Sequence, residues 1–231
     1  MKTRVWTDSA RLLGAAFLVV VVTSLWAGLF SNAAGSGTIS EVLPNIARNT
    51  VLAQASVVGG LANSTGIVVL AVLLYVVLRR VNNTVALVAL GLWVIEAVFY
   101  AVMQLGVLGL VSLGAEYVAA GSPGSSFYQV LGEFLYAGVY TQGLTIHMWF
   151  YCVGGILWYS MFVRSRFVPR PLSVFGVLAV VVGTVGIVVQ LAGVVVPIFV
   201  FLPIGVFEIV IGVWLLLRGI PKLDVLVEVL G

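Results

Sequence analysis

The chain has very little charge. Only 8% of its 231 residues are Asp, Glu, Lys or Arg, whereas 62% are hydrophobic and the mean hydropathy is +1.21. A soluble globular domain carries about 25% charged residues. The composition therefore excludes that class and indicates a protein that lies mostly in a membrane. The net charge of only +3 gives no ground for a nucleic-acid partner, and membrane lipids are the partners that we expect.

Reactive and metal-binding side chains are also scarce. Cys152 is the only cysteine, which excludes an internal disulfide. His147 is the only histidine, so the chain lacks both the ligand cluster of a hydrolytic metal site and the histidine pair of a haem. Because the two lysines, Lys2 and Lys222, lie at the ends of the chain, a retinal Schiff base is excluded as well. We therefore expect no metal and no cofactor.

Long apolar runs fill most of the chain. Each run reaches the roughly 20 residues that a helix needs to cross a hydrocarbon core of about 30 Å. The runs cover residues 12–31, 54–78, 85–113, 141–163, 172–195 and 198–218. They are apolar on every face, whereas the strands of a membrane β-barrel alternate between apolar and polar residues. The sequence predicts an all-α, polytopic integral membrane protein, a six-helix transmembrane bundle in a single domain of residues 1–231.

Basic residues predict the orientation of this bundle. With six spans, all eleven lysines and arginines except Arg48 fall on one side of the membrane. The positive-inside rule then places both termini in the cytoplasm, as expected of a multi-pass protein of the cell membrane. Two external segments are expected, 32–50 and 114–140. The first suits a short interfacial helix capped by Ser40 and limited by Pro44.

Two carboxyl groups lie deep inside the apolar runs. Glu96 and Glu208 are each about 15 Å along the helix from its predicted cytoplasmic end. A charged side chain at that depth costs about 2.5 to 3.5 kcal/mol, so such residues usually face the bundle interior and have a partner. On ideal helices, Tyr100 and Gln104 share a stripe with Glu96, and His147 shares one with Tyr151. We expect these six residues to form one polar cluster, the candidate ligand or proton site.

Three functions suit this cluster. It can bind or transport protons, a small molecule, or a cationic or lipid-like substrate, with aromatic rings offering cation-π faces. Alternatively, a glutamate and His147 can act as acid and base in a lipid- or isoprenoid-modifying enzyme. In the third, the carboxyl groups stay neutral and tie helices together in a structural or accessory subunit without turnover. We favour binding or transport over catalysis, and the sequence fixes neither the ligand nor an oligomeric state.

Three segments, VNNTVALVALGLWVIEAVFYAV, GGILWYSMFVRSRFVPRPLSVFGVLAVVVG and PIGVFEIVIGVWLLLRG, resemble a known family. The family is domain-of-unknown-function family 4386, a group of uncharacterised prokaryotic membrane proteins, and the resemblance covers nearly the whole chain. In the family's pattern, proline and arginine separate two helices, as Pro169 and Arg170 do here. A glutamate in the last helix precedes a tryptophan and a basic-glycine pair, matched here by Glu208, Trp214 and Arg218 with Gly219.

The same resemblance bears on the third apolar run. There the family pattern reads Arg-Leu-x-Glu-Ala, which Glu96 and Ala97 match, while Trp93 occupies the place of the arginine. If that arginine neutralises the glutamate in the family, its loss implies that Glu96 is protonated or paired differently. The resemblance implies a fold and carries no settled activity.

Overall fold

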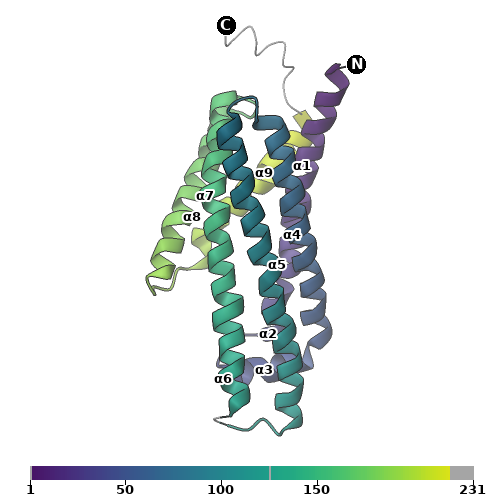
Figure 1. Cartoon of the computed structure of the whole chain (residues 1–231), viewed down its shortest axis with the longest axis vertical. Coiled ribbons are helices and arrows are strands. Elements are labelled where there is room, and N and C mark those ends of the chain that lie inside the picture. The colour runs from purple at the N-terminus through teal and green to yellow at the C-terminus, as the bar shows by residue number, and fades with distance from the viewer. Residues whose placement is uncertain (1, 125, 219–231) are drawn as a thin grey trace. The chain divides into compact units, whose positions relative to one another are not determined.

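The computed structural model describes residues 2–124 and 126–218, with side chains from residue 10 onward. The protein is 87% helical, and no strand occurs in the described residues, which confirms the all-α class (Figure 1). The side chain of Lys2 and the residues Gly219 and Lys222, which enter the sequence argument, lie outside the described part.

Six helical segments are long and apolar enough to cross a membrane, which confirms the predicted number and a multi-pass membrane protein. Three of them are single helices: α4 (Thr50–Leu78), α5 (Asn83–Ala119) and α8 (Arg170–Leu191). The segment Ala10–Ala34 comes from α1 (Lys2–Ala27) and α2 (Leu29–Ala34), and Ile198–Arg218 consists of the 3-10 turn η2 (Ile198–Val200) and α9 (Leu202–Arg218). The segment Phe127–Ser165 consists of α6 (Phe127–Glu133), the π-helix η1 (Phe134–Thr141) and α7 (Gln142–Ser165). A short helix, α3 (Ile39–Arg48), lies between the first two segments.

The predicted external loop 114–140 is wrong in its extent. α5 is 37 residues long and extends to Ala119, and the next helix already begins at Phe127. The break is short because two consecutive residues, Gly121 and Ser122, take left-handed φ values of 81° and 55° and bond back to the last turn of α5. Of the predicted loop, residues 114–119 belong to α5 and residues 127–140 belong to the next helical segment. At 1.5 Å per residue α5 is about 55 Å long, which exceeds a hydrocarbon core of roughly 30 Å.

The fifth predicted span, 172–195, ends too late. α8 stops at Leu191, and Gly193 follows with a φ of 87°. A glycine in this left-handed region commonly ends a helix. The apolar run continues through VVV beyond this point, so hydropathy alone overestimates the length of the helix.

The segment 32–50, which is predicted to be external, contains the expected short helix, but its cap is Thr38 and not Ser40. The backbone N–H of Thr38 donates to Glu41 Oε2 over 2.8 Å, and the Thr38 hydroxyl donates to the same oxygen over 3.3 Å. The bond from the Thr38 N–H, together with the Thr38 side chain accepting from the Glu41 backbone N–H, forms a capping box. Pro44 lies inside α3 and does not end it.

Contacts between Cα atoms divide the chain into two compact units. Unit 1 holds the described parts of Met1–Val21, Ile67–Val94 and Trp149–Gly231, and unit 2 holds Val22–Gly66 and Ile95–Met148. The prediction of a single domain stays a prediction.

In unit 1, α8 and α9 pack as an antiparallel pair. A Cβ atom on Gly176 would lie 2.4 Å from the ring of Phe207, and one on Gly183 would lie 2.8 Å from Ile204 Cδ1. Successive contacts along α8 therefore meet earlier residues of α9. Small residues in membrane helices allow such close approach, which explains why these glycines recur at helix spacing.

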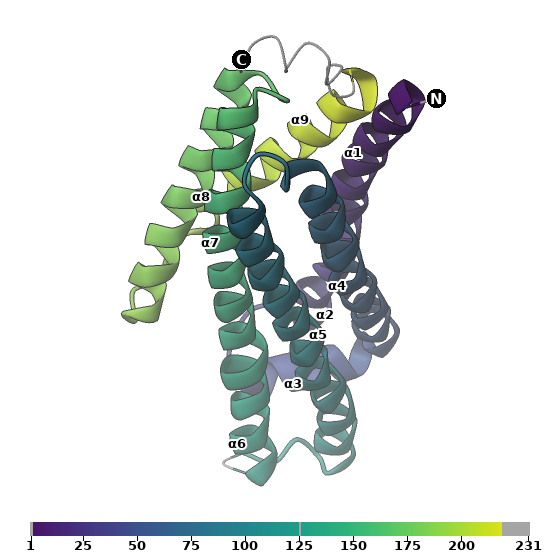
Figure 2. The same ribbon diagram turned by 45° about the horizontal axis from the view of Figure 1, so that its top comes forward.

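In unit 2, α3 runs across the direction of α5 and α6 (Figures 1 and 2). Its apolar residues Leu43 and Ile46 are fully buried. Gly114 of α5 and Gly132 of α6 provide the space, because a Cβ atom on either would lie within 3 Å of Leu43 O or Ile39 Cγ1. The amphipathic pattern of α3 is thus satisfied by packing of its apolar face onto two helices of the same unit.

Candidate functional site

The structure places Glu96 and His147 together in unit 2. Glu96 comes from α5 and His147 from α7, and Glu96 Oε1 lies 3.8 Å from His147 Nδ1. Both residues are buried, with exposed fractions of 2% and 7%. The separation is that of an ion pair when His147 is protonated, and it is too long for a hydrogen bond. His147, the one histidine of the chain, therefore supplies a basic partner for Glu96.

Tyr100 and Gln104 follow Glu96 along the same side of α5. The ring of Tyr100 meets the His147 ring edge to face, with centroids 4.8 Å apart at 77°. Gln104 Nε2 donates to the Tyr100 carbonyl oxygen over 3.0 Å. Its amide fills the space above Gly60 of α4, where a Cβ atom would lie 2.4 Å from Gln104 Cδ. Tyr100 thus adjoins the ion pair, whereas Gln104 serves the contact between α4 and α5.

A π-helix precedes His147 on the same continuous helix. In η1, the Thr141 hydroxyl donates to the Tyr136 carbonyl oxygen, five residues earlier, over 2.9 Å. π-helical turns are rare and are frequent at functional sites. An ideal α-helix was expected here, because neither a proline nor a charge marks the π-helix in the sequence. The wider turn changes which of the residues before His147 share its side of the helix.

The structure places Glu208 and Tyr151 together in unit 1. The Tyr151 hydroxyl donates to Glu208 Oε1 over 2.9 Å, and it also shares a 2.9 Å hydrogen bond with the Tyr159 hydroxyl. Tyr151 is 7% exposed and Tyr159 is fully buried, while Glu208 is partly exposed. Tyr159 was not among the predicted site residues. Its spacing of eight residues from Tyr151 on α7, close to two helical turns, is the signal that could have found it.

Trp93 holds Tyr151 in place. The two rings stack with centroids 5.4 Å apart and planes at 13°, and Trp93 Nε1 donates to the Tyr151 carbonyl oxygen over 3.1 Å. Gly154 makes room, because a Cβ atom there would lie 2.5 Å from Trp93 Cδ1. Trp158 meets the Trp93 ring at 70° over 6.2 Å. Trp93 therefore contributes to the site by orienting Tyr151. It lies in a different unit from Glu96.

The six predicted site residues thus form two sets, one in each unit. The ion-pair set in unit 2 is Glu96, Tyr100, Gln104 and His147, and the carboxyl-phenol set in unit 1 is Glu208 and Tyr151, extended by Tyr159. That the two sets form one cluster stays a prediction. Within residues 2–124 and 126–218, no group of three or more His, Cys, Asp or Glu side chains is arranged to hold a metal ion.

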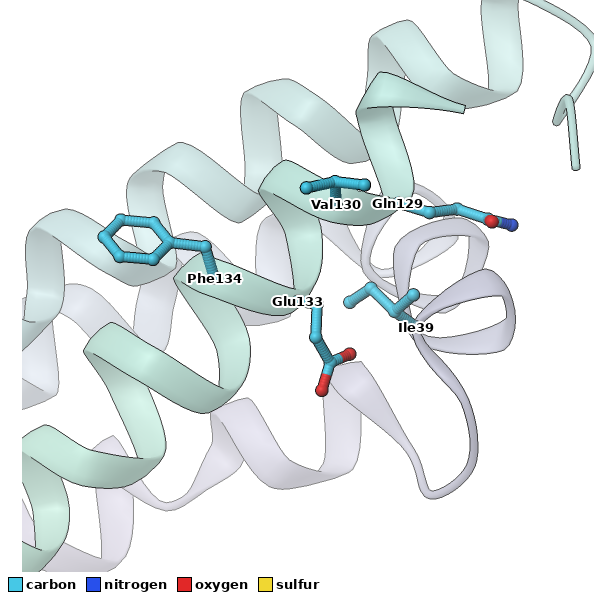
Figure 3. A pocket seen from close by; sticks show the side chains of 5 residues that line it. All are labelled: Ile39, Gln129, Val130, Glu133 and Phe134. Atoms are coloured by element: carbon cyan, nitrogen blue, oxygen red, sulfur yellow. The ribbon is translucent and has the colours of Figure 1, made fainter. Parts of the chain in front are cut away.

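A separate open depression lies between α3 and α6 in unit 2 (Figure 3). Its volume is about 440 Å³, and its lining residues are Ile39, Gln129, Val130, Glu133 and Phe134. The Glu133 carboxylate extends past Ile39, while Phe134 turns away from it (Figure 3). Glu133 and Phe134 are exposed. None of the six predicted site residues lines this depression.

Comparison with known proteins identifies the family. The family described as "Domain of unknown function (DUF4386)" matches residues 12–219, a range that holds both polar sets. No curated protein and no solved structure gives a significant match to the chain. The matched range confirms the resemblance that the glutamate-containing segments indicate. The chain belongs to the DUF4386 family.

Proposed function

We propose that this protein binds or transports a small molecule or lipid within the membrane, and that a proton held by Glu96 and His147 is exchanged as it does so. The supporting observation is the 3.8 Å ion-pair contact between two buried groups at the centre of apolar helices. Buried ionisable residues in membrane helices commonly mark proton or substrate pathways. Lys and Arg are absent from the middle of the six spans, so His147 is the only basic partner that the sequence offers there.

The electrostatics of the pair suit proton exchange. An isolated charge is far more costly than a neutral pair in a medium of low dielectric constant. A glutamate and a histidine side by side are neutral overall when they share one proton, whichever of the two carries it. A second proton would give the pair a net positive charge, and loss of the first would give it a net negative charge. The pair thus favours holding one proton, which it can yield when a positively charged group approaches.

Proton flux into liposomes tests the proposal. The protein is reconstituted in vesicles that hold a pH-sensitive dye, and valinomycin with potassium clamps the membrane potential. We expect wild-type protein to raise the initial rate above that of protein-free vesicles. Glu96→Gln and His147→Gln each remove an ionisable group with little change in shape, and should lower this protein-dependent rate by about tenfold or more.

Glu116→Gln is the matched control, because Glu116 is an exposed carboxylate on the same helix, α5. It should leave the rate unchanged. Equal rates for wild type, Glu96→Gln and His147→Gln would contradict proton exchange and favour a structural role for the pair. A changed lipid profile in membranes that contain wild-type protein, lost with His147→Ala, would instead favour the enzyme alternative.

The proposal includes a cell-membrane location with both termini in the cytoplasm. It is supported by the distribution of basic residues, of which Arg48 alone falls on the opposite side. Reporter fusions to the C-terminus test the orientation. A fluorescent protein, which matures in the cytoplasm, should be bright there, and alkaline phosphatase should be inactive. The reverse pattern would contradict the orientation.

A further inference from the structure

Glu208 has an incomplete set of partners. Its Oε1 atom accepts the hydrogen bond from Tyr151, and within the described residues Oε2 accepts none. The side chain is partly exposed, unlike Glu96. No lysine, arginine or histidine among residues 10–124 and 126–218 forms an ion pair with it. A carboxyl group in an apolar surrounding is thus left with a phenol as its one hydrogen-bond partner in the described chain.

An open space lies beside this carboxyl group. Gly205 precedes Glu208 by three residues on α9 and therefore shares its side of the helix. A Cβ atom built on Gly205 would meet no described heavy atom within 4 Å. Gly212 of the same helix differs, because its Cβ atom would lie 2.8 Å from Leu18 Cδ2. Gly212 is explained by helix packing, and Gly205 is not.

The side chains around this space determine which class of ligand it can bind. The flanking Val206 and Ile209 are 51% and 46% exposed and offer apolar surface. The polar groups are a carboxyl oxygen and the phenol that bonds it, which suit a positive charge. A metal cation requires several oxygen ligands, more than Glu208 supplies. An organic cation with an apolar body satisfies both the carboxylate and the apolar flanks.

We propose that Glu208 and the open side of α9 at Gly205 bind a hydrophobic organic cation, with Tyr151 as the positioning residue for the carboxylate. Trp93 fixes Tyr151 through the ring stack and the hydrogen bond to its carbonyl oxygen. The cation takes the place of a proton on the carboxyl group, so no other charge needs to enter the membrane. The inference rests on the proposed function in naming the class of ligand, but it concerns a different carboxyl group.

Equilibrium binding of radiolabelled tetraphenylphosphonium to the purified protein in nanodiscs tests the inference. Wild type should show saturable binding that excess neutral triphenylphosphine oxide does not displace. Glu208→Gln should weaken binding by about tenfold or more, because the charge interaction is lost. Gly205→Leu should weaken it similarly by filling the space beside the carboxylate. Absence of saturable binding to wild type would overturn the proposal.

Two controls make the result specific. Gly91→Leu introduces the same side chain at a glycine of α5 whose surroundings are equally open within the described chain, and Glu116→Gln removes an exposed carboxylate of unit 2. Both should bind like wild type. If Glu208→Gln does not give a monodisperse protein, Gly205→Leu still decides, because its added side chain meets no described neighbour at Cβ. Unchanged affinity in Gly205→Leu would overturn the proposal.

The proposed function and this inference fail separately. Glu96→Gln is measured in the flux assay and Glu208→Gln in the binding assay. Loss of cation binding in Glu208→Gln, with a proton flux that does not depend on Glu96, would support the cation site and contradict the proton role of the ion pair. A flux that depends on Glu96, with cation binding unaffected by Glu208→Gln, would overturn the cation site alone.

Discussion

Replacement of Tyr151 by phenylalanine should destabilise the protein more than replacement of Tyr159. The Tyr151 hydroxyl joins two hydrogen bonds of 2.9 Å, to Glu208 and to Tyr159, and Tyr151→Phe breaks both. Tyr159→Phe breaks only the bond between the two phenols. Interhelical hydrogen bonds in membrane proteins average about 0.6 kcal/mol and reach about 1.7 kcal/mol. We therefore expect a loss of about 1 to 2 kcal/mol for Tyr151→Phe and about 0.6 kcal/mol for Tyr159→Phe.

The free energy of unfolding in mixed micelles, titrated with sodium dodecyl sulfate, measures these losses. Tyr75→Phe is the matched control, since the Tyr75 hydroxyl donates to Asn83 Oδ1 over 3.1 Å at an exposed position and should contribute little. The double variant Tyr151→Phe/Tyr159→Phe should show a coupling energy of about 0.6 kcal/mol, because the shared bond is lost only once. A coupling energy of zero, or a loss in Tyr151→Phe no larger than in Tyr75→Phe, would refute this hydrogen-bonded arrangement.

Two further predictions concern packing and capping. Gly176→Ala should lower the free energy of unfolding by about 1 to 3 kcal/mol, since its Cβ atom would lie 2.4 Å from the fully buried Phe207 ring. Gly205→Ala should be neutral or stabilising by up to about 1 kcal/mol. The same detergent titration compares the two variants, and equal losses would contradict the described packing of α8 on α9. Glu41→Ala should destabilise the start of α3 by about 1 kcal/mol, because it removes the hydrogen bond between Glu41 and Thr38. Faster amide hydrogen exchange confined to α3 would support this prediction, and unchanged exchange would contradict it.

The sequence predicted the helical class and the number of membrane-crossing segments well, because hydropathy and length determine both. The ends of the helices were harder. α5 and the segment that starts at Phe127 extend into a predicted loop from both sides, because the chain turns sharply at the left-handed pair Gly121 and Ser122. Conversely, Gly193 ends α8 inside an apolar run. Single residues with unusual φ values decide these ends, and hydropathy averaged over many residues does not detect them.

Part of the candidate site was also predictable. Helical spacing brought Tyr100 to the side of Glu96, and depth in the membrane identified Glu96 and Glu208. The pairing of Glu96 with His147 joins two helices and depends on packing that the sequence does not specify. Tyr159 was not predicted, because its role depends on a hydrogen bond to Tyr151 and not on its own position in the helix.

Infrared difference spectroscopy tests whether Glu96 and His147 hold an exchangeable proton. Spectra of the reconstituted protein are recorded as pH is stepped, in the carbonyl stretching region of protonated carboxyl groups. We expect a pH-dependent band in wild type that is absent in Glu96→Gln, altered in His147→Gln and unchanged in Glu116→Gln. A spectrum of Glu96→Gln identical to that of wild type would contradict it.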